Sequence, residues 1–459
     1  MKQVRAFPRL IITKKGTNWV QSGHPWIYEA EVIRMETPDR HVMTMPVKSG
    51  SSVSEKEVSE KEAENRKDIL PENSGLSKAS LENGGLVKTD WENGSLFDAV
   101  SENGRYLGTG YLSLHSKIRL RILSTNANDV FDEAFYRRRI RYALDYRKTV
   151  MGSEADLSAC RLIFGESDGF PGLTVDRFND LLVSQVLSYG TEKNKDLIYH
   201  LLLEELEKDG VSIRGLYERN DVSIRKLEGL PEYKGWYRSS AGSPLTRICE
   251  NGVLYDVDVE NGQKTGFFLD QKYNRLEVAR LARGKRVLDC FTHTGSFALN
   301  AARGGALSVT AVDISKTAVE MAENNAKLNG LEKNMEFITA DVFELLPELI
   351  QKKQRPYDFI ILDPPAFTKS RKTVGSAERG YKEINLRAMQ LLPRGGYLAT
   401  ASCSHFMSHE LFEKMLKSAA KDAGVTLKQI EVRQQAPDHP ILWNVPETDY
   451  LKFYIFQII

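Results

Sequence analysis

Four aspartates in the second half of the sequence stand where a ligand could be bound. Each ends or directly follows a short apolar run that is typical of a buried parallel strand: Asp289, Asp313, Asp341 and Asp363. Because the carboxyl ends of parallel strands meet at one edge of a sheet, we expect these carboxylates to lie close together. Asp313, which ends the second run, is placed to accept hydrogen bonds from a ribose diol.

A tight turn after the first run indicates the kind of cofactor. Residues 290–297 read Cys-Phe-Thr-His-Thr-Gly-Ser-Phe, which predicts a turn containing Gly295 and then a helix. The segment lacks GxGxxG and has no phosphate-loop Lys-Ser/Thr, so a pyrophosphate site is weakly supported. The turn and the four acidic strand ends favour an S-adenosylmethionine site, with a nicotinamide-type domain as the alternative.

The elements that must position these residues differ along the chain. From residue 285 onward, predicted strands and helices alternate, which is typical of a mainly parallel sheet. Residues 160–235 mix short strands with one helix and predict a compact α+β module. Residues 1–35 and 95–123 read as short strands, with Asn103-Gly104 as a hairpin signal, and predict a small β domain.

We therefore expect three domains, at residues 1–124, 125–250 and 251–459. A low-complexity insertion at about residues 37–93 interrupts the first of them. It contains the direct repeat Val-Ser-Glu-Lys-Glu over residues 53–62 and a Glu-Asn pair at residues 72, 82, 92 and 102. Such a composition cannot bury enough apolar surface to offset the entropy of ordering, so a flexible loop is favoured over a dedicated partner-binding segment.

Length and composition describe an ordinary globular protein. The 459 residues are 41% hydrophobic and 27% charged, which excludes collagen-like, largely disordered and membrane-embedded classes. No apolar run approaches the length of a membrane span, and the N-terminus lacks a secretory pattern, so a cytoplasmic protein is expected. The four cysteines form no CxxC pair, and we expect neither a disulfide framework nor a metal site.

The formal net charge of +1 conceals an uneven distribution. Residues 1–35 carry six Lys/Arg against two Glu, and residues 103–150 carry ten Lys/Arg against four Asp/Glu. This asymmetry favours a polyanionic partner for the N-terminal part, with a solvated basic face as the alternative. Residues 129–150 predict an arginine-rich helix that either faces RNA or links two domains.

Several segments together resemble a known family. The series from residue 285 to 405, with Asp289, Asp313, Asp341 and Asp363-Pro364-Pro365, resembles class I methyltransferases. Residues 262–271, 165–177 and 23–28 narrow the resemblance to the bacterial large-subunit ribosomal RNA methyltransferase I family. The resemblance implies an α/β fold: a Rossmann-like methyltransferase domain, an N-terminal PUA-type β-barrel that binds RNA and a central α+β domain. It also implies formation of 5-methylcytosine in 23S ribosomal RNA, and it favours a homodimer.

The resemblance also implies roles for residues of the cofactor site. It places the turn from Phe291 to Gly295 on the methionine side, Asp313 on the ribose, and Asp341 with Val342 near the adenine. The whole predicted cofactor set is Asp289, Phe291, Thr292, Thr294, Gly295, Asp313, Asp341, Val342, Gln263, Lys264, Phe268 and Asp270. Without the resemblance, Phe268 and its neighbours would be assigned to core packing.

The segment Ala401-Ser402-Cys403-Ser404-His405, after a predicted strand, supplies a candidate nucleophile. Carbon C5 of cytosine is not nucleophilic, and a thiolate that adds at C6 gives it the needed enamine character. We therefore predict that Cys403 attacks C6, while Asp363 holds the N3/N4 edge and assists protonation of the ring. Lys369, His405 or water could remove the C5 proton. Lone cysteines are more often inert buried residues, and we expect Cys160, Cys249 and Cys290 to be inert.

Two other functions remain open. Asp363-Pro364-Pro365 followed by an aromatic also resembles amino-methylating enzymes, which need no thiol, so an N-methyltransferase acting on an RNA base is one alternative. The second cysteine of some RNA cytosine-5 methyltransferases is absent after Asp363. A non-catalytic assembly factor that binds ribosomal RNA is the other alternative.

Overall fold

The computed structural model describes residues 6–43, 92–352, 355–368 and 370–459. They form two compact units. The first takes its residues from 1–130, 187–195 and 223–232, and the second from 131–186, 196–222 and 233–459. The domain boundaries expected after residues 124 and 250 stay predictions. No helix in the described part of the chain is long and apolar enough to cross a membrane.

The first unit contains a seven-stranded sheet of order β2-β7-β6-β5-β1-β3-β4. Its strands are β1 (Arg9–Ile12), β2 (Trp26–Tyr28), β3 (Val32–Glu36), β4 (Val42–Met43), β5 (Leu96–Ser101), β6 (Tyr106–Leu112) and β7 (Ile118–Ser124), with helix α1 (Lys14–Gln21) after β1. Neighbouring strands run antiparallel except β1 and β5. Alternate side chains such as Leu10, Phe97 and Leu120 build the core.

Two expectations for this unit can be compared with the sheet. The hairpin predicted at Asn103-Gly104 is confirmed, because β5 and β6 pair around a turn in which Gly104 has φ 79. β4 pairs with β3 through Met43 and Met35, so the sheet extends into the first residues assigned to the insertion. The repeat over residues 53–62 and the Glu-Asn pairs at 72 and 82 lie outside the described residues.

The second unit begins with a five-stranded sheet of order β12-β11-β10-β9-β8. Its elements are α3 (Glu133–Val150), α4 (Glu154–Leu157), β8 (Ala159–Phe164), β9 (Leu173–Phe178), β10 (Leu181–Val186), α5 (Tyr189–Lys208), β11 (Gly215–Asn220) and β12 (Tyr233–Trp236), and the hairpin β13 (Leu245–Glu250) and β14 (Val253–Asp258) follows. Helix α3 is the predicted arginine-rich helix and begins at the N-cap Asp132.

The arginines of α3 bind acidic groups of the same unit. Arg137 Nη1 lies 2.9 Å from Glu205 Oε1, and Arg141 Nη1 lies 3.0 Å from Asp209 Oδ1. Arg147 is fully buried, and its Nη1 lies 2.5 Å from Asp168 Oδ1. This pairing favours a structural role for these three arginines over an RNA-facing one.

The C-terminal part forms a seven-stranded sheet of order β17-β16-β15-β18-β19-β21-β20. Its strands are β15 (Arg286–Cys290), β16 (Ser308–Asp313), β17 (Met335–Thr339), β18 (Phe359–Leu362), β19 (Tyr397–Ser402), β20 (Leu427–Arg433) and β21 (Lys452–Ile458). The first five pair in parallel, whereas β21 runs antiparallel between β19 and β20. The mainly parallel sheet expected from the alternating pattern is therefore confirmed.

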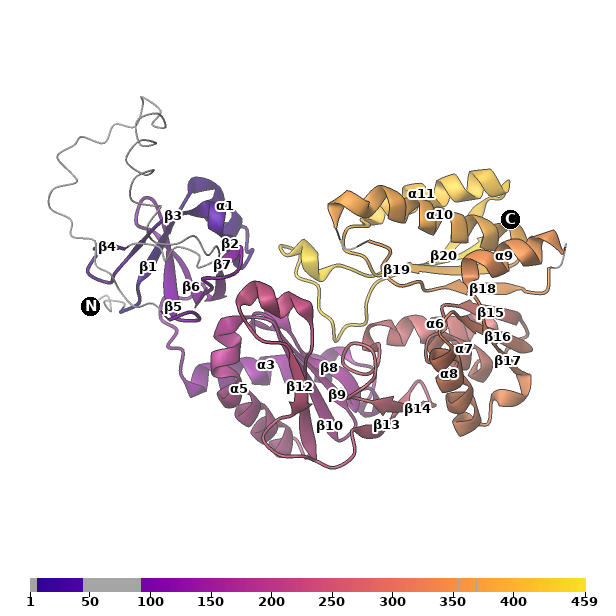
Figure 1. Cartoon of the computed structure of the whole chain (residues 1–459), viewed down its shortest axis with the longest axis horizontal. Coiled ribbons are helices and arrows are strands. Elements are labelled where there is room, and N and C mark those ends of the chain that lie inside the picture. Colours follow the sequence, from indigo (N-terminus) through magenta and orange to yellow (C-terminus); the bar gives the residue numbers. More distant parts are fainter. Residues whose placement is uncertain (1–5, 44–91, 353–354, 369) are drawn as a thin grey trace, which may run out of the picture. The chain divides into compact units, whose positions relative to one another are not determined.

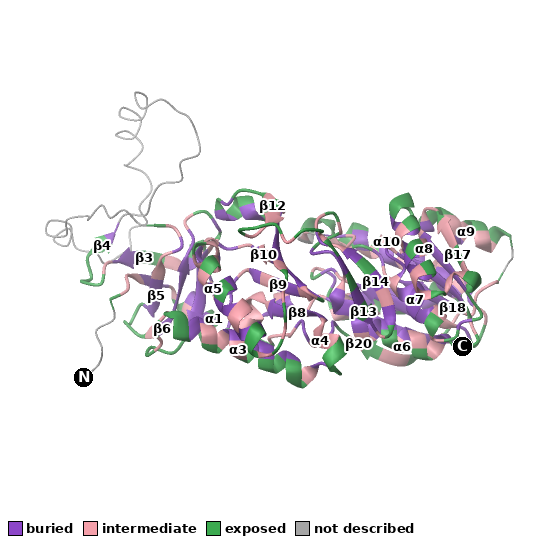
Figure 2. Cartoon of the chain, turned by 90° about the horizontal axis from the view of Figure 1, so that it is seen from below, coloured by how far each residue is buried: buried purple, intermediate pink, exposed green. Residues whose placement is uncertain are grey.

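Helices cover both faces of this sheet (Figure 1). They are α6 (Lys272–Ala282), α7 (Ser296–Arg303), α8 (Lys316–Asn329), α9 (Val342–Gln351), α10 (Val374–Leu391) and α11 (His409–Ala423). One apolar cluster joins α9, α10 and α11 to one face, and another joins α6 and α7 to the opposite face. The central strands β15, β18, β19 and β21 accordingly lie buried between helices that turn exposed residues outward (Figure 2), whereas the edge strands β17 and β20 are largely half-buried or exposed.

Candidate active site

The carboxyl edge of the parallel strands gathers most of the predicted site residues. Asp289 is the second-to-last residue of β15, and Asp313 is the last residue of β16. Asp363 and Cys403 directly follow β18 and β19, which are parallel neighbours. Asp341 follows β17 and begins helix α9 as its N-cap, where its Oδ1 accepts a hydrogen bond from the Phe343 N–H at 2.8 Å.

The turn after β15 is held by the first two aspartates. Asp289 Oδ2 accepts hydrogen bonds from Thr292 Oγ1 at 2.6 Å and from the Ala298 N–H at 2.9 Å. Asp313 Oδ2 accepts one from the His293 N–H at 2.9 Å. The two carboxylates therefore hold the turn from both sides, together with the backbone bond from the Thr292 N–H to the Val312 carbonyl.

The backbone of this turn is strained. Phe291 and His293 have φ of 65° and 51°, which residues other than glycine rarely adopt. Gly295 has φ 80°, and a Cβ at this position would lie 2.9 Å from Ala322 Cβ. Strain of this kind persists where the surrounding structure enforces it and is concentrated at ligand sites.

Two buried polar atoms at the turn have no partner in the protein. They are Asp289 Oδ1 and Thr294 Oγ1. Buried oxygens are nearly always hydrogen-bonded, so their isolation indicates a polar ligand at this turn. Burial raises the pKa of Asp289 to about 7, against the lowering effect of its bond with Thr292.

A loop before α6 lies against this turn. The Phe268 ring is T-shaped to the His293 ring at 5.3 Å, and Lys264 Nζ lies 4.5 Å from the centre of the same Phe268 ring. Arg275, which is buried, anchors the loop by donating to the Phe268 carbonyl at 2.7 Å and to Glu250 at 2.6 Å. Gln263 is exposed, and its carbonyl accepts a hydrogen bond from the Gly266 N–H.

Asp270 connects this loop to the C-terminal segment. Its Oδ2 accepts a hydrogen bond from the Tyr450 hydroxyl at 2.8 Å, and its buried Oδ1 has no partner in the protein. Asp363 Oδ1 accepts one from Gln271 Nε2 at 3.0 Å. Burial, with the negative charge of Asp270 nearby, raises the pKa of Asp363 to about 7.

The Cys403 thiol is the partly exposed thiol at this edge. Burial and the charge of Asp363 raise its pKa to about 11, while Lys264 and Lys452 act to lower it. The Lys452 side chain is buried in β21, and its Nζ donates to the carbonyl oxygens of Ser404 at 2.6 Å and Tyr450 at 2.9 Å. The Lys452 amino group is thus fixed beside the loop that carries the thiol, and burial lowers its pKa to about 8.

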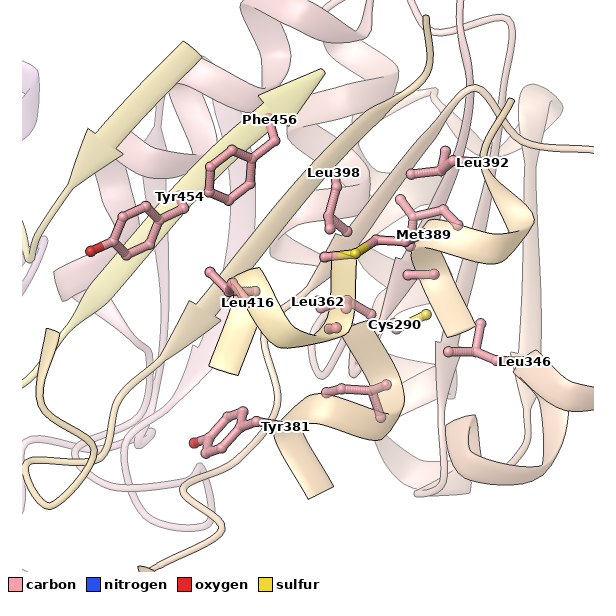
Figure 3. Close-up of a cluster of buried hydrophobic side chains, with 14 of the residues drawn as sticks. Cys290, Leu346, Leu362, Tyr381, Met389, Leu392, Leu398, Leu416, Tyr454 and Phe456 are labelled. Atoms are coloured by element: carbon pink, nitrogen blue, oxygen red, sulfur yellow. The ribbon is translucent and has the colours of Figure 1, made fainter. Parts of the chain in front are cut away.

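The other cysteines lie elsewhere. Cys290 points into the apolar cluster under α10, next to Leu362 and Met389 (Figure 3). Cys160 is buried and donates to the Leu157 carbonyl, and Cys249 is exposed on β13. This placement agrees with the expectation that Cys290 and Cys160 are inert.

Sequence reasoning missed several residues that shape the site. Gln271 lies within residues 262–271, which carry the family resemblance but assign it no role, and Tyr450 and Lys452 belong to no motif named from the sequence. The Arg275–Glu250 pair gave no sequence signal, because its members come from different elements. His405 is exposed and its ring contacts Phe406, and Lys369 lies outside the described residues.

Comparisons with known proteins agree with this geometry. A family model described as S-adenosylmethionine-dependent methyltransferase matches residues 234–456, and a PUA-like domain matches residues 78–125. A SAM-dependent methyltransferase from Streptococcus mutans covers 98% of this chain and 99% of its own, with a TM-score of 0.72 and 20% identity. A methyltransferase solved with SAH gives a TM-score of 0.74 at 19% identity over the same shares.

Curated relatives are closer in sequence. Ribosomal RNA large subunit methyltransferase I of Klebsiella pneumoniae (strain 342) is 36% identical over 99% of both chains. The protein of the same name from Aeromonas salmonicida (strain A449) is 44% identical over 76% of this chain and 87% of its own.

The strand order and the family match define a class I S-adenosylmethionine-dependent methyltransferase with a PUA-like domain. The expected fold class and cofactor are thereby confirmed. The chain belongs to the ribosomal RNA large subunit methyltransferase I family.

Proposed function

We propose that the protein forms 5-methylcytosine in 23S ribosomal RNA through a covalent bond between the Cys403 sulfur and C6 of the target base. The names of the relatives supply the RNA class. One observation carries the chemistry: a thiol and a carboxyl group with a raised pKa follow neighbouring parallel strands, at the edge where the strained turn lies.

The residues at this edge fit S-adenosylmethionine. Two unpartnered buried oxygens line the turn, and a carboxylate ends the next strand, where a ribose diol would be recognised. Asp313 would hold the ribose, Asp341 and Val342 the adenine end, and the turn from Phe291 to Gly295 the methionine end. When bound, the cofactor supplies a methyl group on a positively charged sulfur.

The residues of the chain would then act in order. The Cys403 thiolate bonds to C6 of cytosine, the C5–C6 electron pair shifts toward C4, and N3 takes a proton from the protonated Asp363. Carbon C5, now nucleophilic, takes the methyl group. Loss of the C5 proton to a base re-forms the C5–C6 double bond, which expels the thiolate, and N3 returns its proton to Asp363.

The test is a covalent trap. RNA that carries 5-fluorocytidine cannot lose a proton from C5, so the enzyme with S-adenosylmethionine should form a complex that survives denaturing gels. Nucleoside analysis of unmodified RNA after reaction should show 5-methylcytidine. An N-methylated nucleoside without a trapped complex would assign the enzyme to amino methylation, and RNA binding without transfer would identify an assembly factor.

Packing of the aromatic after the Asp363 segment favours the thiol chemistry over amino methylation. Amino methylation would need the Phe367 ring to stack on the flipped base. That ring instead packs against the rings of Tyr381 and Phe343, with distances between ring centres of 4.6 Å and 5.9 Å.

Replacing Asp313 with alanine should weaken cofactor binding. A hydrogen bond to a charged group contributes about 1.5 to 3 kcal/mol, so the dissociation constant for S-adenosylmethionine should rise roughly tenfold to hundredfold. Calorimetric titration measures it. Asp358→Ala is the control, because Asp358 precedes β18 at the opposite edge and pairs with the half-exposed Arg286. Equal affinity in both variants would remove Asp313 from the cofactor site.

A further inference from the structure

A cavity of about 560 Å³ opens next to the loop that carries Cys403. Its walls include His405 and His409 after β19, Leu442, Trp443 and Pro446 after β20, and Lys452 of β21. Cavities of about 300 to 1,000 Å³ hold small organic groups. Lys452 joins the cavity to the thiol loop, because it lines the cavity and donates to the Ser404 carbonyl.

The wall that follows β20 is firmly held. Asp438 is buried, and its Oδ2 accepts a hydrogen bond from the Arg161 N–H at 2.8 Å. Its backbone carbonyl accepts a second one from Arg147 Nη2 at 2.9 Å. Thr448 Oγ1 accepts the Leu442 N–H at 2.9 Å. These hydrogen bonds tie the segment to β8, to α3 and to itself.

Trp443 is the exception in this ordered segment. Its side chain is 96% exposed although Ile441, Leu442 and Pro446 offer apolar surface in the same cavity wall. A tryptophan held at a cavity rim by a tied loop provides a flat ring for stacking, and nucleobases are flat partners for such rings.

The charged groups around the cavity are also suited to an RNA segment. His405, His409 and Lys452 line it together with one carboxylate, Asp449. That carboxylate is engaged, since its Oδ1 lies 3.3 Å from His409 Nε2. His409 is engaged on both ring nitrogens, by Tyr454 and Asp449, so the exposed His405 ring and the third hydrogen of Lys452 Nζ are the donors that the lining offers to a base or its backbone.

We infer that this cavity binds a nucleobase of the RNA substrate next to the target cytosine, with its ring stacked on Trp443. The inference rests on the proposed function, which supplies the RNA. It adds a second base-binding site, which would contribute to the choice of target.

The test compares Trp443→Ala and Trp443→Phe with the wild type on an RNA fragment, measuring KM, kcat and S-adenosylmethionine affinity. Stacking on an aromatic contributes enough for alanine to raise KM for RNA roughly tenfold to hundredfold, with kcat and cofactor affinity kept. Phenylalanine should restore most of the loss. Leu307→Ala, an exposed apolar residue before β16 at the opposite edge, is the control.

Abasic RNA sharpens the result. Removing the flanking base should weaken wild-type binding by a similar factor and should add nothing to Trp443→Ala. Wild-type KM in Trp443→Ala would overturn the inference, as would unchanged RNA binding with an altered sedimentation rate, which would place a second copy of the chain on the cavity. If the wild type transfers no methyl group, the proposed function fails. The RNA affinities of the wild type and Trp443→Ala, measured without turnover, then still test whether the cavity binds a base.

Discussion

Replacing Cys403 with alanine is expected to lower methyl transfer to RNA by roughly four to six orders of magnitude, the scale for removal of an essential nucleophile. Without the sulfur, C6 gains no bond and C5 stays unreactive toward the methyl group. The variant should also form no covalent complex with 5-fluorocytidine RNA. Single-turnover transfer of a radiolabelled methyl group measures the loss over this range.

The matched control for this variant is Cys249→Ala. Cys249 is an exposed thiol on β13, so its removal tests general effects of thiol loss. It should leave both transfer and trapping as in the wild type. Cys403→Ala should still bind S-adenosylmethionine, because the predicted cofactor residues do not include it. Full methyl transfer by Cys403→Ala would refute the covalent mechanism and support amino methylation.

In the resting protein, Asp363 and Cys403 have the protonation states opposite to those that the mechanism requires. With pKa values of about 7 for Asp363 and about 11 for Cys403, the main form near pH 8 is a carboxylate beside a neutral thiol. The mechanism needs a thiolate beside a neutral carboxyl group. The charged form of Lys452 favours the thiolate, which is the direction that the reaction requires, and burial lowers the pKa of this amino group to about 8.

The strand-end residues were predictable because the signal is local. An apolar run followed by an acid marks the end of a buried parallel strand, and this pattern placed Asp289, Asp313 and Asp363 at one edge. Cys403 directly follows the next strand of the same alternating pattern, so it could be expected at this edge, whereas the direct pairing of β18 with β19 could not, because β17 and β18 are also consecutive and do not pair. Each inference needed only a few consecutive residues.

The missed features depend on contacts between distant segments. Lys452 reaches the thiol loop because β21 inserts antiparallel between β19 and β20, an order that periodicity does not encode. Arg137 and Arg141 of α3 gave a basic stripe in the sequence, but their acidic partners come from α5 and the residue after it. A charge pattern cannot show which charges a fold pairs internally.

Replacing Asp363 with asparagine should change the pH dependence of catalysis as well as its rate. In the wild type the reactive form holds a proton on Asp363 and none on Cys403. Below pH about 7 this form increases with pH, because the thiolate fraction rises while Asp363 stays protonated. Above pH about 7 the two titrations cancel, so kcat/KM levels off, and it declines only as Lys452, whose pKa burial lowers to about 8, loses the charge that favours the thiolate.

Asparagine has no proton to lose in this range, so the change of slope near pH 7, where the rise of kcat/KM gives way to a plateau, should disappear. The logarithm of kcat/KM should then rise linearly with pH until the thiol titrates, from a level at pH 8 roughly 10²- to 10⁴-fold below the wild type, the scale for loss of a general acid. Initial rates between pH 6 and 9.5 measure both effects. Asp289→Asn is the matched control, because the pKa of Asp289 is also raised to about 7. A change of slope near pH 7 that persists in Asp363→Asn and vanishes in Asp289→Asn would assign the titration to the cofactor turn and remove Asp363 from proton transfer.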